Sequence, residues 1–214
     1  MLSEDYLVRQ IMQFVSVIAK IMGLKMGGQY QVALEVIDQS LGELLGISAE
    51  LVNLLDDESL YKALTINEGI DLERLGMIAE LFKEKGDILN LQKQKMESDN
   101  CYLRSLNGYL LISSNKDSSQ PNELSQKIDE LIIKLVNYDL PEKTILDLFC
   151  YYENEGKYAK AENILSLLVN HPKVNADIRS EMISFYQRLL LKSQKELSAG
   201  GMEKNRIRLK LKDM

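Results

Sequence analysis

Residues 148–165 read LFCYYENEGKYAKAENIL, with apolar helical spacing on each side of one glycine. Before it, Ile145, Leu148 and Tyr152 recur at steps of three and four residues, which places them on one helical face. The same face continues after the glycine through Tyr158, Ala161, Ile164, Leu165 and Leu168. Gly156 ends the first helix because glycine adopts the left-handed conformation without a Cβ clash. Neither helix can bury its apolar face alone, so this helical hairpin must pack against neighbouring helices.

The hairpin resembles a tetratricopeptide repeat. The resemblance rests on the spacing of Leu148, Tyr152, Gly156, Tyr158 and Ala161, with Pro172 near the position of the motif's proline. The chain departs from the motif at three positions. Ile145 occupies the motif's position for a large residue, and Phe149 and Leu168 occupy two positions where the motif has small residues.

Two weaker copies of the pattern occur earlier in the chain. One is the Gly28-x-Tyr30-x-x-Ala33 core, and the other centres on Gly86, with Leu91 in place of the small alanine. The glycines lie much further apart than one repeat of about 34 residues, so additional helices must lie between the copies. We therefore predict an all-α fold in which antiparallel helical hairpins pack as an irregular tetratricopeptide-like right-handed array.

Periodicity and capping residues predict the other helices. Their expected ranges are 3–25, 29–45, 49–55, 57–64, 71–85, 87–112, 122–137 and 175–197. The polar segment 113–121 is the clearest linker. We expect one helical domain over residues 1–200, with a subdivision near 113–122, and a basic tail over residues 201–214.

Both ends of the chain allow two interpretations. The 3–25 helix is apolar except for a narrow stripe formed by Arg9, Gln13, Ser16 and Lys20, so it is either a covered central helix or a surface for self-association. Residues 206–212 alternate basic and apolar side chains, a pattern typical of an extended strand. This tail is either a frayed terminus or a short arm that docks on an acidic body, which is either its own or a partner's.

Composition favours a cytoplasmic protein. The net charge is −6, and because residues 203–214 hold five Lys or Arg and two acidic residues, the remainder carries −9. An acidic body suits neither nucleic-acid phosphates nor an anionic membrane, so we expect neither partner. Cys101 and Cys150 have no metal-type spacing and indicate a reduced pair. The N-terminus lacks the basic region of a signal peptide, and the apolar run 11–26 is too short to span a membrane.

The whole chain is also similar to an uncharacterised bacterial family of tetratricopeptide-like helical proteins. The similarity rests on residues 4–11, 19–24, 44–47, 140–142 and 185–190. It implies the helical fold and supplies no activity and no cofactor.

No motif for catalysis or metal binding is present. There is no phosphate-binding loop, no dinucleotide-binding glycine pattern and no His-Glu-x-x-His sequence. The only histidine, His171, is expected at the C-terminal end of a helix, facing its dipole. Asp56 and Asp57 are better explained as a helix cap and first turn than as metal ligands. We therefore predict no catalytic, cofactor-binding or metal-binding residue, and no enzymatic activity.

Two functions follow from these patterns. The first is a non-catalytic scaffold for protein–protein interaction, whose partner is an unidentified protein or a peptide with basic and apolar residues. The resemblance implies that its groove is lined by Lys143, Leu146, Cys150, Glu153 and Asn154, and in the poorer copy by Glu73, Gly76, Glu80, Lys83 and Glu84. An ordinary solvated helix face also explains these charges. A homodimer through the apolar N-terminal helix is a further expectation.

The alternative is a small-molecule-sensing or enzymatic helical domain with a pocket between helices. Tyrosines are the candidates for its lining, although amphipathic packing with the hydroxyl at the rim explains them equally well. These residues are Tyr102, Tyr109, Tyr151, Tyr152, Tyr158 and Tyr186.

Overall fold

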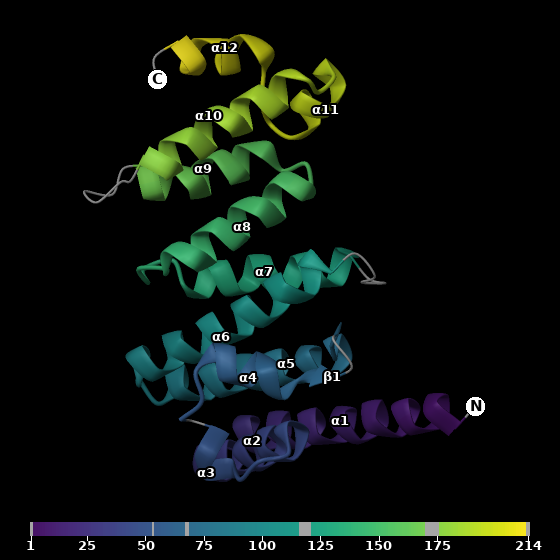
Figure 1. The fold of residues 1–214 in the computed structure, drawn as a ribbon. Helices are drawn as coiled ribbons and strands as arrows, with labels where there is room; N and C mark the ends of the chain where they lie inside the picture. Colours follow the sequence, from purple (N-terminus) through teal and green to yellow (C-terminus); the bar gives the residue numbers. More distant parts are fainter. Residues whose placement is uncertain (1, 53, 67–68, 116–120, 170–175, 213–214) are drawn as a thin grey trace. The chain divides into compact units, whose positions relative to one another are not determined.

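The computed structural model describes residues 2–52, 54–66, 69–115, 121–169 and 176–212. These residues form twelve α-helices and one short antiparallel β-ribbon (Figure 1), which confirms the all-α class. The elements are α1 (Leu2–Met26), α2 (Tyr30–Leu45), α3 (Ala49–Val52), α4 (Asp57–Ala63), β1 (Thr65–Ile66), β2 (Gly69–Ile70), α5 (Leu72–Leu91), α6 (Lys95–Ser114), α7 (Pro121–Lys134), α8 (Glu142–Asn154), α9 (Tyr158–Val169), α10 (Ala176–Leu190), α11 (Gln194–Ala199) and α12 (Lys204–Lys212).

The chain divides into two compact units, residues 1–138 and 139–214. Tyr138 is the last residue of the first unit, and the basic C-terminal residues belong to the second unit. Residues 116–120 of the predicted linker, together with His171 and Pro172, lie outside the described residues.

The first unit begins with the predicted hairpin of α1 and α2, which turns at Gly28 (φ +69°). Both helices pack on α5, and α6 packs on α5 and α7. The side chain of Asp56 caps α4 by accepting a hydrogen bond from the Ser59 amide at 2.7 Å, so its predicted role as a helix cap is confirmed. The ribbon pairs Thr65 with Ile70 directly before α5.

The predicted turn at Gly86, followed by one helix over 87–112, is wrong. Helix α5 continues through Gly86 to Leu91, and the turn follows, with Lys93 at φ +62°. Gly86 serves close packing: a Cβ there would lie 2.6 Å from ring carbons of Tyr102 on α6. On the same pair of helices, a Cβ at Gly108 would lie 3.2 Å from the Ala79 Cβ. Glycines thus let α5 and α6 approach along their length.

The second unit contains the α8–α9 hairpin, which turns at Gly156 (φ +70°) as predicted. Helix α10 packs against α9 and α12. The rings of Phe149 on α8 and Phe185 on α10 meet edge to face at 5.2 Å, and both are buried. Apolar side chains from α8, α9 and α10 therefore form the core of this unit.

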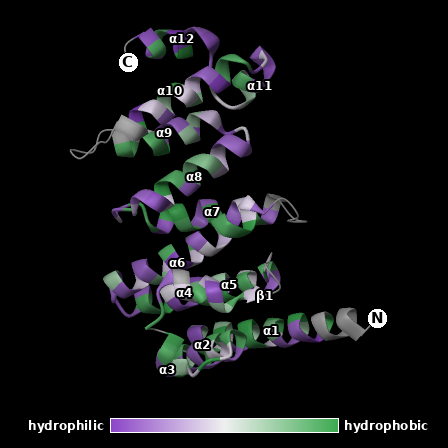
Figure 2. Cartoon of the chain, viewed as in Figure 1, coloured by the Kyte–Doolittle hydropathy of each residue, from purple (hydrophilic) through white to green (hydrophobic). Residues whose placement is uncertain are grey.

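Two predictions for the C-terminal segment are wrong. The helix predicted over 175–197 ends at Leu190, and Ser193 then starts α11 with a capping box completed by Glu196. The segment predicted as a strand is α12, which is mainly hydrophilic (Figure 2). It folds as a helix because Ile207 is fully buried while Arg206 and Lys210, one turn apart, reach the same carboxylate.

Candidate functional site

The predicted groove residues of the best repeat lie along one face of α8. Lys143, Cys150 and Asn154 are exposed, Leu146 is half-buried, and the opposite face of the helix carries buried Leu148. Their spacing of three to four residues keeps them on the same side of the helix. The structure therefore brings the predicted α8 residues together on one accessible surface.

Glu153 extends this surface to α10. Both of its carboxylate oxygens accept hydrogen bonds from Arg188 at 2.8 Å, and Arg188 also donates to Glu181 at 2.8 Å. These hydrogen bonds raise the pKa of the Arg188 guanidinium. Partial burial, with Glu153 and other carboxylates nearby, raises the pKa of the Cys150 thiol, so the thiolate nucleophile is disfavoured.

The predicted residues of the poorer copy are differently placed. Glu80, Lys83 and Glu84 on α5 all take part in ion pairs within the first unit. Glu84 is 5% exposed, and it pairs with Lys25 of α1 at 2.5 Å. These three side chains therefore contact the protein's own helices.

Helices α5, α6 and α7 are joined by two copies of one arrangement, each with a carboxylate, a tyrosine and a lysine. In the first, Glu80 accepts from Tyr109 at 2.7 Å and from Lys127 at 2.8 Å. In the second, Asp87 accepts from Tyr102 and from Lys134, both at 2.8 Å. Each lysine also lies over the ring of its tyrosine, at 5.4 and 5.1 Å. The copies lie seven residues apart on every helix.

The electrostatics of the two triads favour the charged carboxylates. Burial alone would raise the pKa of Glu80, but hydrogen bonds from Lys127 and Tyr109 outweigh it and lower the pKa. Burial would likewise raise the pKa of Asp87, but hydrogen bonds from Lys134 and Tyr102 outweigh it and lower the pKa. Burial and the adjacent carboxylate raise the pKa of both tyrosines, so their hydroxyls stay protonated as donors.

The sequence analysis missed this network, although a signal was present. Positions 80, 83 and 87 read Glu, Lys, Asp, and positions 127, 130 and 134 read Lys, Glu, Lys. The signs are opposite at each step and the separation is always 47 residues. That complementarity is the pattern expected of two parallel helices that pair along one face.

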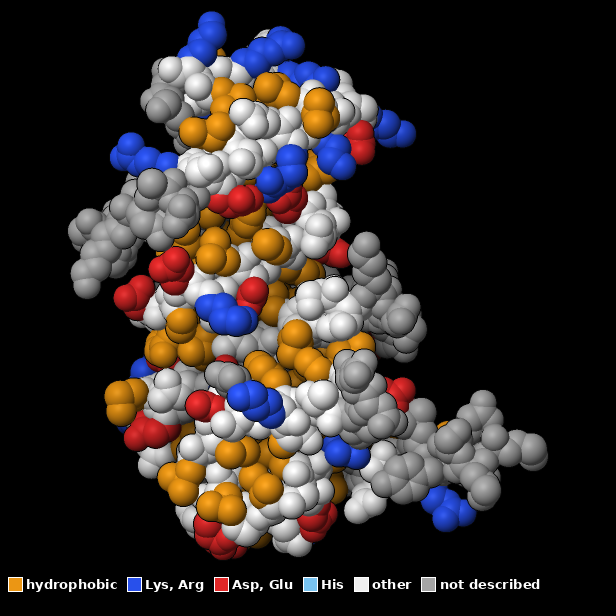
Figure 3. Space-filling model, viewed as in Figure 1, with side chains coloured by type: hydrophobic (Ala, Val, Ile, Leu, Met, Phe, Trp, Pro, Cys, Tyr) orange, Lys and Arg blue, Asp and Glu red, His pale blue; other side chains and the backbone are white. Residues whose placement is uncertain are grey.

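The basic tail docks on its own unit through Glu162 of α9. This carboxylate, 4% exposed, accepts hydrogen bonds from Arg206 and Lys210 at 2.6 Å and from the Tyr186 hydroxyl at 2.5 Å. The segment thus docks on an acidic group of its own unit, the single buried carboxylate of Glu162. Lys and Arg side chains gather on the surface over α12 (Figure 3).

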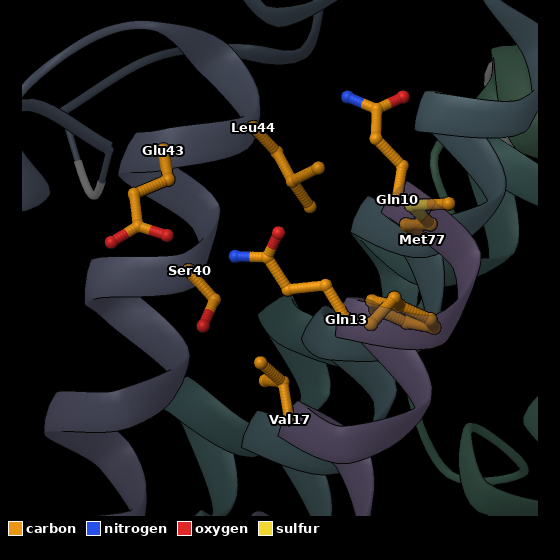
Figure 4. A pocket seen from close by; sticks show the side chains of 8 residues that line it. Gln10, Gln13, Val17, Ser40, Glu43, Leu44 and Met77 are labelled. Carbon is orange, nitrogen blue, oxygen red and sulfur yellow. The ribbon is translucent and has the colours of Figure 1, made fainter. Parts of the chain in front are cut away.

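A cavity of about 180 Å³ lies between α1, α2 and α5. In Figure 4 the Gln13 side chain extends from α1 toward Ser40 and Glu43 of α2. Its other lining residues are Gln10, Phe14, Val17, Leu44 and Met77. None of the tyrosines predicted to line a pocket is among these residues. The hydroxyls of Tyr102, Tyr109 and Tyr186 instead donate hydrogen bonds to carboxylates, as expected for amphipathic packing.

Within the described ranges, no three His, Cys, Asp or Glu side chains are grouped closely enough to hold a metal ion. No helix in that part of the chain is both long and apolar enough to cross a membrane.

The described residues form an all-helical fold in which α1–α2, α5–α6 and α8–α9 are consecutive helical hairpins. The chain belongs to a family of unknown function, DUF6483, whose model matches residues 1–214. No curated protein and no solved structure matches it.

Proposed function

We propose that this protein is a non-catalytic scaffold for protein–protein interaction, built from tetratricopeptide-like hairpins in a right-handed array. Its peptide-binding surface is the face of α8 defined by Lys143, Leu146, Cys150, Glu153 and Asn154, together with Arg188 of α10. The observation that carries the proposal is that the five α8 residues share one accessible helix face, while Glu80, Lys83 and Glu84 are engaged within the first unit.

The charges of this face indicate what it can bind. Asp147, Glu153 and Glu181 provide three carboxylates, and Lys143 and Arg188 provide two cations. Lys143 pairs with Asp147 at 2.6 Å, so most of these charges are already compensated. The surface therefore suits a peptide that combines apolar side chains with a small number of basic ones, in which the apolar groups contact Leu146 and Cys150.

Selection from a random peptide library on the purified chain tests this proposal. The test variant is Asn154→Arg, which places a long cation on the α8 face. Its matched control is Asn163→Arg, at an exposed position of α9 in the same unit. We expect selected peptides to bind the wild-type chain and the control equally, and Asn154→Arg at least tenfold more weakly. Equal affinity for both variants would refute this surface.

The cavity between α1, α2 and α5 supports a second candidate, the sensing of a small polar molecule. Gln10, Gln13, Ser40 and Glu43 supply polar groups beside an apolar floor. A ligand that binds the folded state alone raises the melting temperature. A metabolite screen on the wild-type chain and on Gln13→Leu tests this candidate: a shift that Gln13→Leu abolishes supports it, and a shift that survives points to another site.

A further inference from the structure

Helix α1 has two apolar faces, and only one of them is covered. Ile21 is fully buried in the core of the first unit, where Phe14, Val17, Ile18 and Leu24 pack with it. On the other side, the side chains of Val8, Met12, Val15, Ala19, Met22 and Met26 are exposed; we refer to these six residues as the α1 stripe. A helix with apolar residues on more than one side is normally buried on more than one side.

The stripe has the spacing of a coiled-coil interface. Its members are separated alternately by four and three residues, so the pattern repeats every seven residues. This repeat keeps one stripe in contact with a partner helix of the same kind. The stripe contains no charged residue, and small Ala19 at its middle allows a close approach.

The exposed area matches what a dimer needs. The stripe's five large side chains and the adjacent Ile11 are 44–87% exposed. At roughly 100 Å² of apolar surface per fully exposed aliphatic side chain, they present about 350 Å² in each chain. Two such surfaces provide about 700 Å², which is the apolar share of a specific interface of roughly 1,200 Å².

We infer that the protein forms a two-fold symmetric homodimer in which the α1 stripes of two copies pack antiparallel. In this register Val8 lies opposite Met26 of the partner copy, Met12 opposite Met22, and Val15 opposite Ala19, so all six residues are covered. A parallel pair would place Ala19 against Ala19 and leave a gap at the centre.

The length of α1 supports the antiparallel choice. Helix α1 has 25 residues and α2 has 16, so the N-terminal end of α1 extends beyond its hairpin partner (Figure 1). Within residues 8–16 of α1, Gln10 and Phe14 alone are shielded to an intermediate degree, and the other side chains are exposed. In an antiparallel pair, this uncovered half lies along the C-terminal half of the partner's α1.

Sedimentation velocity on the intact chain tests the dimer. We expect the dimer to predominate at a chain concentration of about 100 μM and to dissociate on dilution. Met12→Glu and Val15→Glu should weaken association at least tenfold, because each buries an unpaired charge against an apolar residue of the partner copy, Met22 or Ala19. Lys20→Glu introduces a glutamate at an exposed position outside the stripe, with a larger change in net charge, and should leave the dimer intact. A monomeric wild-type chain, or a dimer insensitive to both stripe variants, overturns the inference.

Disulfide trapping tests the orientation and does not depend on the charged variants. In a Cys150→Ser background, chains carrying Val8→Cys are mixed with chains carrying Met26→Cys. The antiparallel pair links the two kinds of chain and links neither to itself, because like positions lie about 27 Å apart along the axis. Trapping of Val8→Cys to itself overturns the antiparallel arrangement, and an absence of all trapping overturns the interface.

Discussion

Removing the two cations that face Glu162 should destabilise the second unit strongly. The perturbation is the double change Arg206→Met and Lys210→Met, which keeps the apolar stems of both side chains on α12. Glu162 is 4% exposed and would retain the Tyr186 hydroxyl as its partner among the three donors described. A buried carboxylate without compensating charge is among the most costly groups in a folded protein.

The magnitude follows from which partner is buried. The two cations are 49% and 40% exposed, so solvent screens part of their attraction and either one alone is worth about 1 kcal/mol. Removing both leaves the desolvation cost of Glu162 uncompensated, and we expect the free energy of unfolding to fall by about 3 kcal/mol. Adding Glu162→Gln to the double variant removes the charge and keeps an acceptor for Tyr186. This triple variant should therefore recover about 2 kcal/mol of the loss.

Urea unfolding followed by circular dichroism measures these differences, with a shared slope for all variants. Limited proteolysis adds a local readout, since α12 should become susceptible in the double variant first. The reasoning is refuted if the double variant lies within 1 kcal/mol of the wild-type chain, or if Glu162→Gln recovers nothing.

Three further predictions concern the packing of the first unit. The pKa values of Glu80 and Asp87 are lower in the folded state than their unfolded values near 4, so the stability they add is present above about pH 5 and is lost as the pH falls through the folded values. When Lys127 and Lys134 are changed to Met, the free energy of unfolding should therefore fall less steeply with decreasing pH. Gly86→Ala should cost about 2 kcal/mol by overpacking, whereas Gly76→Ala, whose Cβ would lie 3.7 Å from its nearest neighbour, should stabilise α5 by up to about 1 kcal/mol in thermal melts. Burial raises the pKa of the Cys101 thiol to about 11, so a thiol reagent at pH 8 should modify it only at the rate of unfolding, whereas exposed Cys150 should react from the folded state, more slowly than a free thiol.

Local patterns predicted the hairpins and failed where long-range packing decides. Gly28 and Gly156 were identified correctly as turns because each separates two amphipathic segments and takes a positive φ. Gly86 has the same sequence context, yet it lies inside α5, since its role depends on the Tyr102 ring that approaches from α6. The actual turn contains Lys93 with a positive φ, which no local pattern indicates.

The candidate site shows the same limit. A repeat motif specifies the spacing of residues within one helix, so it places the α8 residues on one face of that helix. It carries no information on which neighbouring helix takes up each side chain. Glu80 and Glu84 were therefore predicted to bind a partner although Lys127 and Lys25 already pair with them. The spacing shared between α5 and α7 would have identified Glu80 and Lys83 as internal contacts, whereas Glu84 pairs with Lys25 of α1 outside that spacing.

The two proposed surfaces also imply a testable coupling. If the α1 stripes hold two chains together, each assembly presents two α8 faces, and a peptide displayed densely on a surface can engage both. The apparent affinity for such a surface should then exceed the affinity for the free peptide by about a hundredfold. Met12→Glu should remove this gain and leave the affinity for the free peptide unchanged, whereas Asn154→Arg should reduce both. Because the two variants alter different compact units, a gain that survives Met12→Glu would show that bivalence does not arise from α1.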